Sequence, residues 1–151
     1  MYVVDFETKA IEPYPNYPPE PVGVSIKYGD LPSAYFSWGH PTENNCTKEV
    51  VQKVLAAIWS SNEQILFQNA KFDLEVAYKW FGLPIPTPAR IEDTMFLIFL
   101  YDPLASTFSL KPSAERILGI PPTEQESVRD WLVSHGKVPS NSKSWGAHIS
   151  E

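Results

Sequence analysis

The spacing of hydrophobic residues changes along this chain. Residues 2–4 form an unbroken apolar run, residues 22–26 alternate apolar with polar positions, and residues 33–38 are again rich in β-forming side chains. This pattern predicts three strands, the first buried and the others joined to it as an antiparallel meander. From Thr47 onward apolar residues recur at helical spacing, which predicts a helix over about residues 48–59 with Thr47 as its cap.

The next part alternates short strands with helices. Residues 64–67 form a short apolar strand, and the following helix begins after Asn69, a possible cap, and runs to Phe81. Gly82 is the predicted end of this helix because glycine adopts the left-handed conformation that closes helices. Alternation of strand and helix indicates βαβ crossovers with parallel strand pairing.

After a second proline-rich loop the chain is expected to be mainly helical. A brief strand leads into a helix from Thr94 to about Tyr101, with Asp93 as its predicted N-cap. Two more helices are predicted in "FSLKPSAERIL" and "TEQESVRDWLVSHG", the second with Thr123 and Glu126 at capping-box spacing.

Composition indicates an ordinary globular protein. The 151 residues fit one domain, and 43% hydrophobic with 20% charged residues is typical of water-soluble chains. The net charge of −6 argues against nucleic-acid binding through a broad basic surface, although it allows a nuclease that meets phosphate through metal ions. Cys46 is the one cysteine, and no apolar run is long enough for a membrane span, so we expect a reducing, cytoplasmic location.

Two carboxylates follow the first predicted strand. Asp5 and Glu7 are two residues apart, so in an extended chain their side chains point to the same side. They would lie at the carboxyl end of the sheet, where α/β proteins commonly bind ligands. Two such carboxylates repel each other, and a hard cation such as Mg²⁺ or Mn²⁺ would relieve this repulsion. The alternative is a pair of surface acids at a strand end.

A third carboxylate is predicted at the same edge of the sheet. Asp73 falls in the first turn of the helix after Asn69, where the free backbone amides favour an ionised carboxylate. Strand and helix ends of neighbouring crossovers meet at one edge, so Asp73 is expected to face Asp5 and Glu7. A routine first-turn aspartate that only stabilises its helix is the alternative.

Four short motifs occur in an order that resembles a known family. "VVDFET", "QNAKFDLEV", "EDTMFLIFLYDP" and "FSLKPSAERILG" are similar to the 3′–5′ exonuclease domain of DnaQ-like (DEDD) nucleases. The resemblance is to the proofreading domain of family A DNA polymerases in particular, with ribonuclease D as a relative, and it covers about residues 2–120. It implies an α/β, ribonuclease H-like fold with a mixed central sheet of about five strands flanked by helices.

The resemblance also implies an activity and a site. Such enzymes remove nucleotides from the 3′ end of single-stranded or frayed DNA with two divalent metal ions, Mg²⁺ or Mn²⁺. By this carry-over Asp5 would bridge the two ions, Glu7 would hold the one that activates water, and Asp73 would support the second. Thr8 and Asn69 would position the terminal nucleotide. A covalently linked polymerase domain C-terminal to this chain, in a bacterial or phage-infected cell, is the implied setting.

One family feature is missing. The third motif, Tyr-x-x-x-Asp or His-x-x-x-x-Asp, orients the attacking water, and neither pattern occurs in these residues. We therefore expect residues 1–151 to be a single exonuclease-like domain that stops before the third motif and is weakly active or inactive alone. Asp102, Glu126 and Asp130 are the candidates for a substitute carboxylate.

Two other functions fit the same motifs. Ribonuclease D-like trimming of RNA is one, because recognition of RNA depends on contacts to the 2′-hydroxyl that these motifs do not reveal. The other is a degenerate exonuclease fold that serves as a scaffold or binds single-stranded nucleic acid. Aromatic side chains in the first part of the chain would then stack on bases or, alternatively, belong to the core, namely Tyr14, Tyr17, Tyr35, Phe36 and Trp38.

Overall fold

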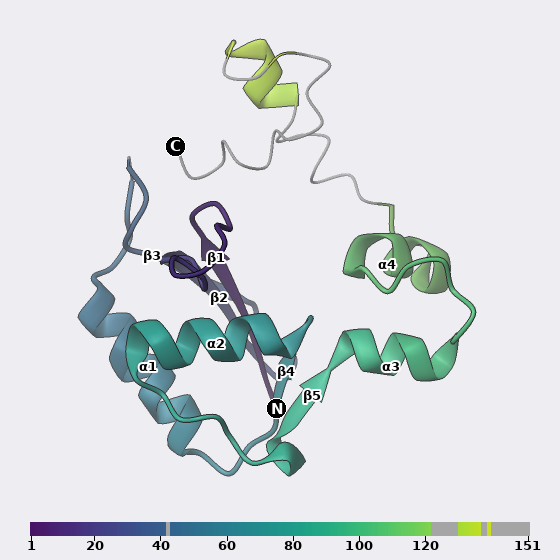
Figure 1. The fold of residues 1–151 in the computed structure, drawn as a ribbon, viewed down its shortest axis with the longest axis horizontal. Coiled ribbons are helices and arrows are strands. Elements are labelled where there is room, and N and C mark those ends of the chain that lie inside the picture. The colour runs from purple at the N-terminus through teal and green to yellow at the C-terminus, as the bar shows by residue number, and fades with distance from the viewer. Residues whose placement is uncertain (42, 122–129, 137–138, 140–151) are drawn as a thin grey trace. The chain divides into compact units, whose positions relative to one another are not determined.

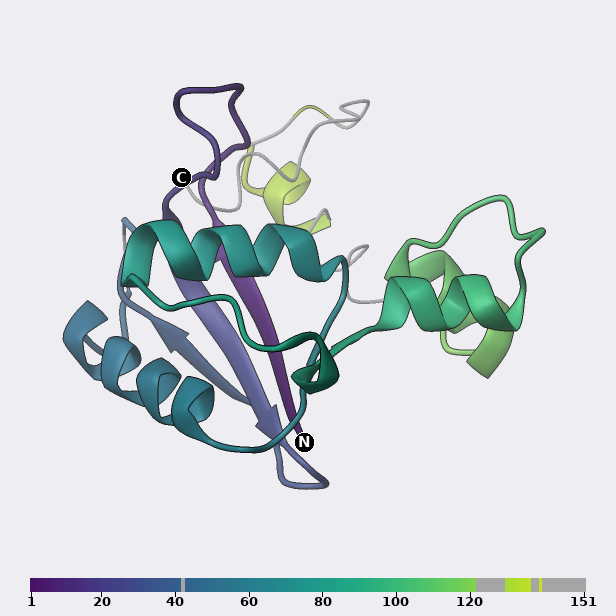
Figure 2. The same ribbon diagram turned by 60° about the horizontal axis from the view of Figure 1, so that its bottom comes forward.

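The described residues fall in two compact units. A computed structural model of the chain (Figures 1 and 2) describes residues 1–41, 43–121, 130–136 and 139. One unit, Met1–Thr94, holds the sheet, and we call it the sheet unit; the helical unit begins at Met95. Each is described by itself below.

Five strands form one mixed sheet in the order β3-β2-β1-β4-β5. The strands are β1 (Tyr2–Thr8), β2 (Pro21–Tyr28), β3 (Ala34–Ser37), β4 (Ile65–Phe67) and β5 (Ile91–Asp93). Strand β2 pairs antiparallel with both β1 and β3, whereas β4 pairs parallel with both β1 and β5. The predicted meander followed by parallel crossovers is confirmed.

Strand β1 is longer than the strand that the apolar run of residues 2–4 predicts. It continues through both carboxylates, because the ladder with β2 pairs Asp5 with Ser25 and Glu7 with Gly23 before an irregularity at Thr8. Backbone pairing with β2, rather than side-chain hydrophobicity, therefore extends β1. The two acids lie in its second half.

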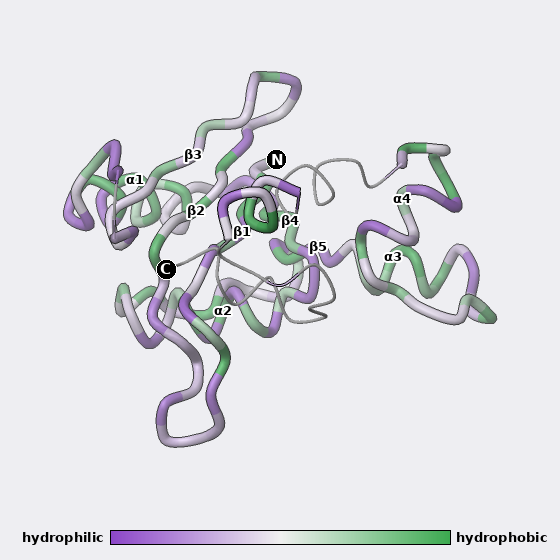
Figure 3. The backbone as a smooth tube through the Cα atoms, turned by 90° about the horizontal axis from the view of Figure 1, so that it is seen from above, coloured by the Kyte–Doolittle hydropathy of each residue, from purple (hydrophilic) through white to green (hydrophobic). Residues whose placement is uncertain are grey.

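Helices α1 (Lys48–Ser60) and α2 (Ala70–Phe81) build one core with the sheet. Val4 and Phe6 of β1 join this core, which also includes Leu55 of α1 and Val76 of α2. Both helices lie on the same side of the sheet (Figure 3). Since side chains alternate along a strand, Asp5 and the other odd-numbered residues of β1 point to the opposite face.

The helical unit contains the predicted helices as far as it is described. Helix α3 (Thr94–Tyr101) is followed by α4 (Leu110–Leu118), and residues 130–134 are again helical. The predicted capping pair Thr123 and Glu126 lies outside the described residues. Among the residues that the structure describes, no helix is long and apolar enough to cross a membrane.

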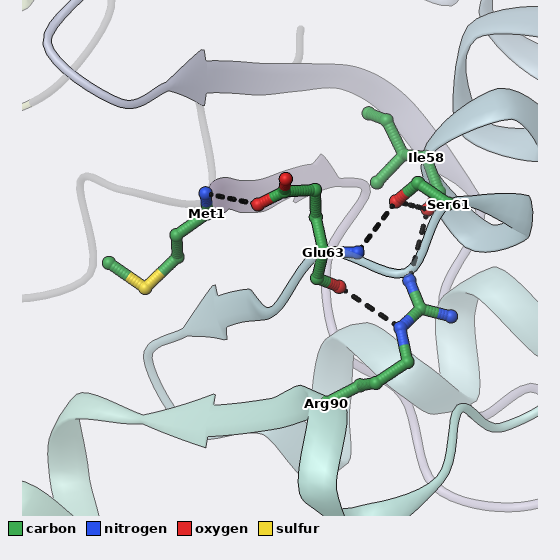
Figure 4. Close-up of polar contacts among 5 residues, drawn as sticks. All are labelled: Met1, Ile58, Ser61, Glu63 and Arg90. Atoms are coloured by element: carbon green, nitrogen blue, oxygen red, sulfur yellow. Dashed lines mark hydrogen bonds and ion pairs between the residues drawn. The ribbon is translucent and has the colours of Figure 1, made fainter.

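Arg90 fastens the end of α1 to the rest of the sheet unit (Figure 4). It lies in the 3₁₀ turn η1 (Pro88–Arg90), and its guanidinium donates to the carbonyls of Ile58 at 3.1 Å, Trp59 at 2.8 Å and Glu63 at 3.0 Å. The last turn of α1 contains no basic residue of its own. Arg90 therefore supplies, from another segment, the positive charge that favours a helix C-terminus.

We predict that Arg90→Ala lowers the free energy of unfolding by about 2–3 kcal/mol, because three carbonyls lose a charged donor. Urea unfolding of the whole chain measures this loss. Arg116→Ala is the matched control, since Arg116 makes a partly exposed ion pair with Asp102 at 3.6 Å and such pairs contribute less than about 1 kcal/mol. Equal losses in the two variants would contradict the role of Arg90.

Candidate functional site

Strand β1 extends beyond its neighbour β4, and α2 fills the gap. Strand β4 pairs with β1 only at Tyr2 and Val3. Further along the same strand, the backbone amide of Phe6 donates to Oδ1 of Asp73 at 3.0 Å in a buried hydrogen bond. A buried amide without a partner is costly, so the first turn of α2 provides the acceptor that a longer β4 would have provided.

This bond brings the three predicted carboxylates into one segment of structure. Asp5 and Glu7 flank Phe6 on β1 and are both exposed, whereas Asp73 is only 2% exposed. The residues opposite Asp5 and Glu7 on β2 are the small Ser25 and Gly23. The site therefore combines two open carboxylates with a third that is buried behind the strand.

Burial dominates the protonation of Asp73. Loss of solvation raises the pKa of its carboxyl from 3.8 to about 7, against the opposing effect of the hydrogen bond from Phe6. The negative charges of Asp5 and Asp93 raise this pKa further. Near neutral pH the carboxyl is thus close to half-protonated, and a divalent cation beside it would favour the ionised form.

Asp93 holds the start of α2, while the predicted capping of the helix after it stays a prediction. Its two carboxylate oxygens accept from the backbone amides of Asn69 at 3.0 Å and Ala70 at 2.8 Å. The register of the sheet explains this, because Asp93 pairs with Phe67, two residues before Asn69. Asn69 has a left-handed backbone with φ of 63°, and its side chain makes no cap hydrogen bond.

The two predicted substrate-binding residues lie beside the carboxylates. Thr8 follows Glu7 at the strand irregularity, and its hydroxyl donates to the carbonyl of Lys9 at 3.0 Å. The side chain of Asn69 is exposed at the start of α2, four residues before Asp73. Their contact with a nucleotide stays a prediction.

A tyrosine and a histidine that sequence reasoning did not connect with the site lie near Glu7. The hydroxyl of Tyr35 is 2.6 Å from Nε2 of His40, and a Cβ added to Gly23 would come within 2.2 Å of that hydroxyl. Burial raises the pKa of Tyr35, and the charge of Glu7 adds to this effect. Only the antiparallel register, which places Gly23 opposite Glu7, reveals this neighbourhood.

The carboxylates do not form a preformed metal-binding site. Within the described ranges, no group of three or more His, Cys, Asp or Glu side chains is arranged to hold a metal ion. The donors themselves suit Mg²⁺ or Mn²⁺, which prefer carboxylate oxygens. Asp5 and Glu7 are exposed and fit as metal ligands. Asp73 would have to bind a metal ion while it remains hydrogen-bonded to the amide of Phe6. The ligand roles of these residues stay predictions.

The proposed substitutes for the missing fourth carboxylate belong to other parts of the chain. Asp102 forms its ion pair with Arg116 inside the helical unit. Asp130 is exposed at the start of the helical residues 130–134, and Glu126 lies outside the described residues. None of these observations adds a ligand to the site on β1.

The strand order and the flanking helices define a ribonuclease H-like α/β fold, as predicted. Comparison with solved structures agrees. A structure described as the apo form of a nuclease matches with a TM-score of 0.62 and 16% identity over 97% of this chain and 62% of its own. NrnC of Brucella melitensis matches with a TM-score of 0.61 and 18% identity over 99% of this chain and 64% of its own.

Two further structures of Brucella melitensis NrnC carry ligands. One has bound Mg²⁺ and matches with a TM-score of 0.59 and 15% identity over 97% of this chain and 77% of its own. The other is bound to pGG, with a TM-score of 0.58, 18% identity, and coverage of 99% and 65%. At such identities the likeness establishes the fold, and this chain spans less than two thirds of three of these four structures.

Comparisons of sequence alone add nothing to this. No family model matches the chain, and no curated protein matches it.

We predict that the stability of the chain falls as pH rises through the range in which Asp73 titrates. The native state keeps the proton up to a pKa of about 7, whereas the ordinary value is 3.8. The stabilisation is complete below about pH 4 and is lost by about pH 7, as much as about 4 kcal/mol. Urea unfolding from pH 4 to 8 should show a flatter profile for Asp73→Asn, which keeps an oxygen for the Phe6 amide. Parallel profiles would contradict this assignment.

We predict that Asp93→Ala destabilises the start of α2 by about 1–3 kcal/mol, because the amides of Asn69 and Ala70 lose their acceptor. Thermal unfolding gives the loss, and hydrogen exchange of these amides locates it. Thr47→Ala is the control, since Thr47 occupies the N-cap of α1 without a side-chain cap hydrogen bond. A loss in Asp93→Ala no larger than in the control would show that the cap is dispensable.

Proposed function

We propose that this chain carries the first carboxylates of a metal-dependent 3′–5′ exonuclease acting on single-stranded nucleic acid. The observation that carries the proposal is the hydrogen bond from Phe6 to Asp73, which joins a buried carboxyl to the strand segment bearing Asp5 and Glu7. Support comes from the matched structures, which include a nuclease, NrnC with Mg²⁺ and NrnC with pGG.

The residues of the sheet unit would divide the work as follows. Two divalent ions, when bound, would activate a water molecule and stabilise the charge on the leaving 3′-oxygen. Asp5 and Glu7 are exposed and point from one face of β1, so they would bind the ions from the open side. Asp73 would contribute the third carboxylate. Thr8 and Asn69 would contact the terminal nucleotide from either side.

The substrate that we propose is the 3′ end of single-stranded or frayed DNA. RNA trimming is the alternative, and contacts to the 2′-hydroxyl would decide between them. The proofreading subtype gains no support from the structures compared above, whose descriptions name a nuclease and NrnC and no polymerase. A linked polymerase domain rests on the sequence resemblance alone, and a cytoplasmic location rests on the single cysteine and the short apolar runs of the sequence.

The scaffold alternative explains the site less well. A carboxyl that is 2% exposed next to a second carboxylate destabilises the folded chain near neutral pH. A domain that had lost its chemistry would gain stability by replacing Asp73 with a neutral residue. Retention of Asp5, Glu7 and Asp73 in one segment favours a use for their charge.

We predict that the chain binds Mn²⁺ and that Asp5→Ala weakens this binding at least tenfold, because an open carboxylate ligand is lost. Glu7→Gln should also weaken it. Calorimetry or the Mn²⁺ electron paramagnetic resonance signal measures the affinity, with Asp30→Ala as the control, since Asp30 is an exposed aspartate in a turn outside the site. Equal Mn²⁺ affinity of the Asp5, Glu7 and control variants would overturn the metal site.

The activity test uses matched single-stranded DNA and RNA labelled at the 5′ end, with Mg²⁺ or Mn²⁺ present. Because the third motif is missing from these residues, we expect slow 3′ trimming or none from the chain alone. Any trimming must disappear in Asp5→Ala. Shortening from the 5′ end, or trimming that persists in that variant, would contradict the proposal.

A further inference from the structure

We propose that an open pocket on the outer side of α2 binds one nucleotide of the strand whose 3′ end lies at the carboxylates. This inference rests on the proposed function and names a substrate subsite for it. The pocket has a volume of about 440 Å³. Its walls are the proline-rich loop after β1, at residues 11–14 and Tyr17, and the side chains of Lys71 and Glu75 on α2.

The pocket and the carboxylate site share the first turns of α2. Lys71 and Glu75 are four residues apart and therefore lie on the same face of the helix. Asp73 is midway between them in sequence, so it lies on the other side of the helix, where it meets Phe6. The loop that forms the opposite wall begins directly after Glu7 and Thr8. The pocket therefore adjoins the end of β1, and a strand bound at the carboxylates, which point to the other face of the sheet, would reach the pocket round that end.

Aromatic rings provide a stacking surface. The side chain of Tyr14 is 75% exposed, and its ring centroid is 5.4 Å from that of Tyr17. Tyr17 in turn lies 6.4 Å from the ring of Phe72, which ties it to α2. Single-stranded nucleic acids bind proteins by stacking bases on such exposed rings. Tyr14 offers a ring that the protein itself leaves largely uncovered.

Two charged groups of the pocket have bonding capacity left. Glu75 accepts a hydrogen bond from the hydroxyl of Tyr17, which helps to raise the pKa of that tyrosine to about 12. Its Oε2 atom is buried and has no hydrogen-bond partner among the described residues, a cost that a donor from a ligand would relieve. Lys71 forms neither an ion pair nor a hydrogen bond with any part of the chain that the structure describes, although Glu75 is one turn away.

The chemistry of these groups fits a nucleotide. An ammonium group binds phosphate, and a carboxylate oxygen accepts from the N–H groups on the edge of a base. The third charged residue of the pocket, Glu12, is already engaged by the side-chain amide of Asn16. A ligand with an anion at one end, N–H donors at the other and an aromatic ring between them would satisfy Lys71, Glu75 and Tyr14 together.

The loop is held in place before any ligand arrives. The ammonium of Lys79 donates to the carbonyls of Asn16 at 3.2 Å, Tyr17 at 3.3 Å and Pro18 at 3.1 Å. The indole N–H of Trp80 donates to the Pro18 carbonyl at 3.2 Å. Both donors belong to α2, so the two walls of the pocket are joined. Such prior ordering reduces the entropy lost on binding.

The experiment measures binding to the 151-residue chain in EDTA, so that neither metal binding nor cleavage contributes. The probes are 5′-GMP, guanosine, which lacks the phosphate, and ribose 5-phosphate, which lacks the base. Amide chemical shifts of the non-proline residues in 11–17 and of residues 71–75 report the site. We expect 5′-GMP to bind most tightly, and Tyr14→Ala to weaken GMP and guanosine binding by about 5-fold or more, as loss of a stacked base implies.

The charged variants separate the two ends of the ligand. Lys71→Ala should weaken binding of 5′-GMP and leave guanosine unchanged, whereas Glu75→Gln should weaken both. Lys53→Ala and Tyr101→Ala are the matched controls, since Lys53 lies exposed on α1 and Tyr101 is 74% exposed in the helical unit. Ribose 5-phosphate binding as tightly as 5′-GMP, or pocket variants behaving like the controls, would overturn the proposal.

Two further measurements distinguish a nucleotide from a basic peptide as the ligand, and a failure of the pocket from a failure of the metal site. A trilysine peptide that binds in the pocket through Glu75 while 5′-GMP does not would mean that the pocket takes a basic peptide, and the nucleotide proposal would fall. Nucleotide binding is measured in EDTA and Mn²⁺ binding without it, and Asp30→Ala, which lies outside both sites, should leave both unchanged. Loss of nucleotide binding with intact Mn²⁺ binding therefore counts against the pocket alone, and the reverse result counts against the metal site alone.

Discussion

The hydrogen bond between the Phe6 amide and Asp73 is the contact on which the site depends. A sheet whose central strand is longer than its parallel neighbour exposes a backbone amide that must find an acceptor once it is buried. Here the acceptor comes from the first turn of α2, at 3.0 Å. The same bond that completes the hydrogen bonding of β1 thus places a third carboxylate behind Asp5 and Glu7.

Two opposing effects decide the state of Asp73. The hydrogen bond from Phe6 and the amide of its own helix turn favour the ionised form, whereas burial and the charges of Asp5 and Asp93 oppose it. Burial wins, since the pKa rises to about 7. Asp93 affects both the structure and the protonation of this site. It accepts hydrogen bonds from the amides of Asn69 and Ala70, and its negative charge raises the pKa of Asp73. The start of α2 is therefore stabilised by a residue that also raises the pKa of Asp73.

Local patterns in the sequence were enough for the antiparallel meander and the parallel crossovers and for naming three carboxylates, and they failed where the cause is not local. Strand alternation places Asp5 and Glu7 on one face, and the helical period after Asn69 locates Asp73. The end of β1 was misjudged because pairing with Ser25 and Gly23 extends it. The contact of Asp93 with the start of α2 was missed because its partner amides lie 23 and 24 residues earlier, which only the β4–β5 register reveals.

Helix α2 connects everything that we attribute to function. Its inner face carries Asp73, and its outer face carries Lys71 and Glu75, so the periodicity of one helix assigns alternate residues to the carboxylate site and to the pocket. Asp93 fixes the start of this helix to β5, and Lys79 near its end fixes the proline-rich loop. A shift of α2 along the sheet would move Asp73 away from Phe6. The same shift would move Lys71 along the wall of the pocket. The pocket wall and the carboxylate geometry are therefore set by the same two anchors.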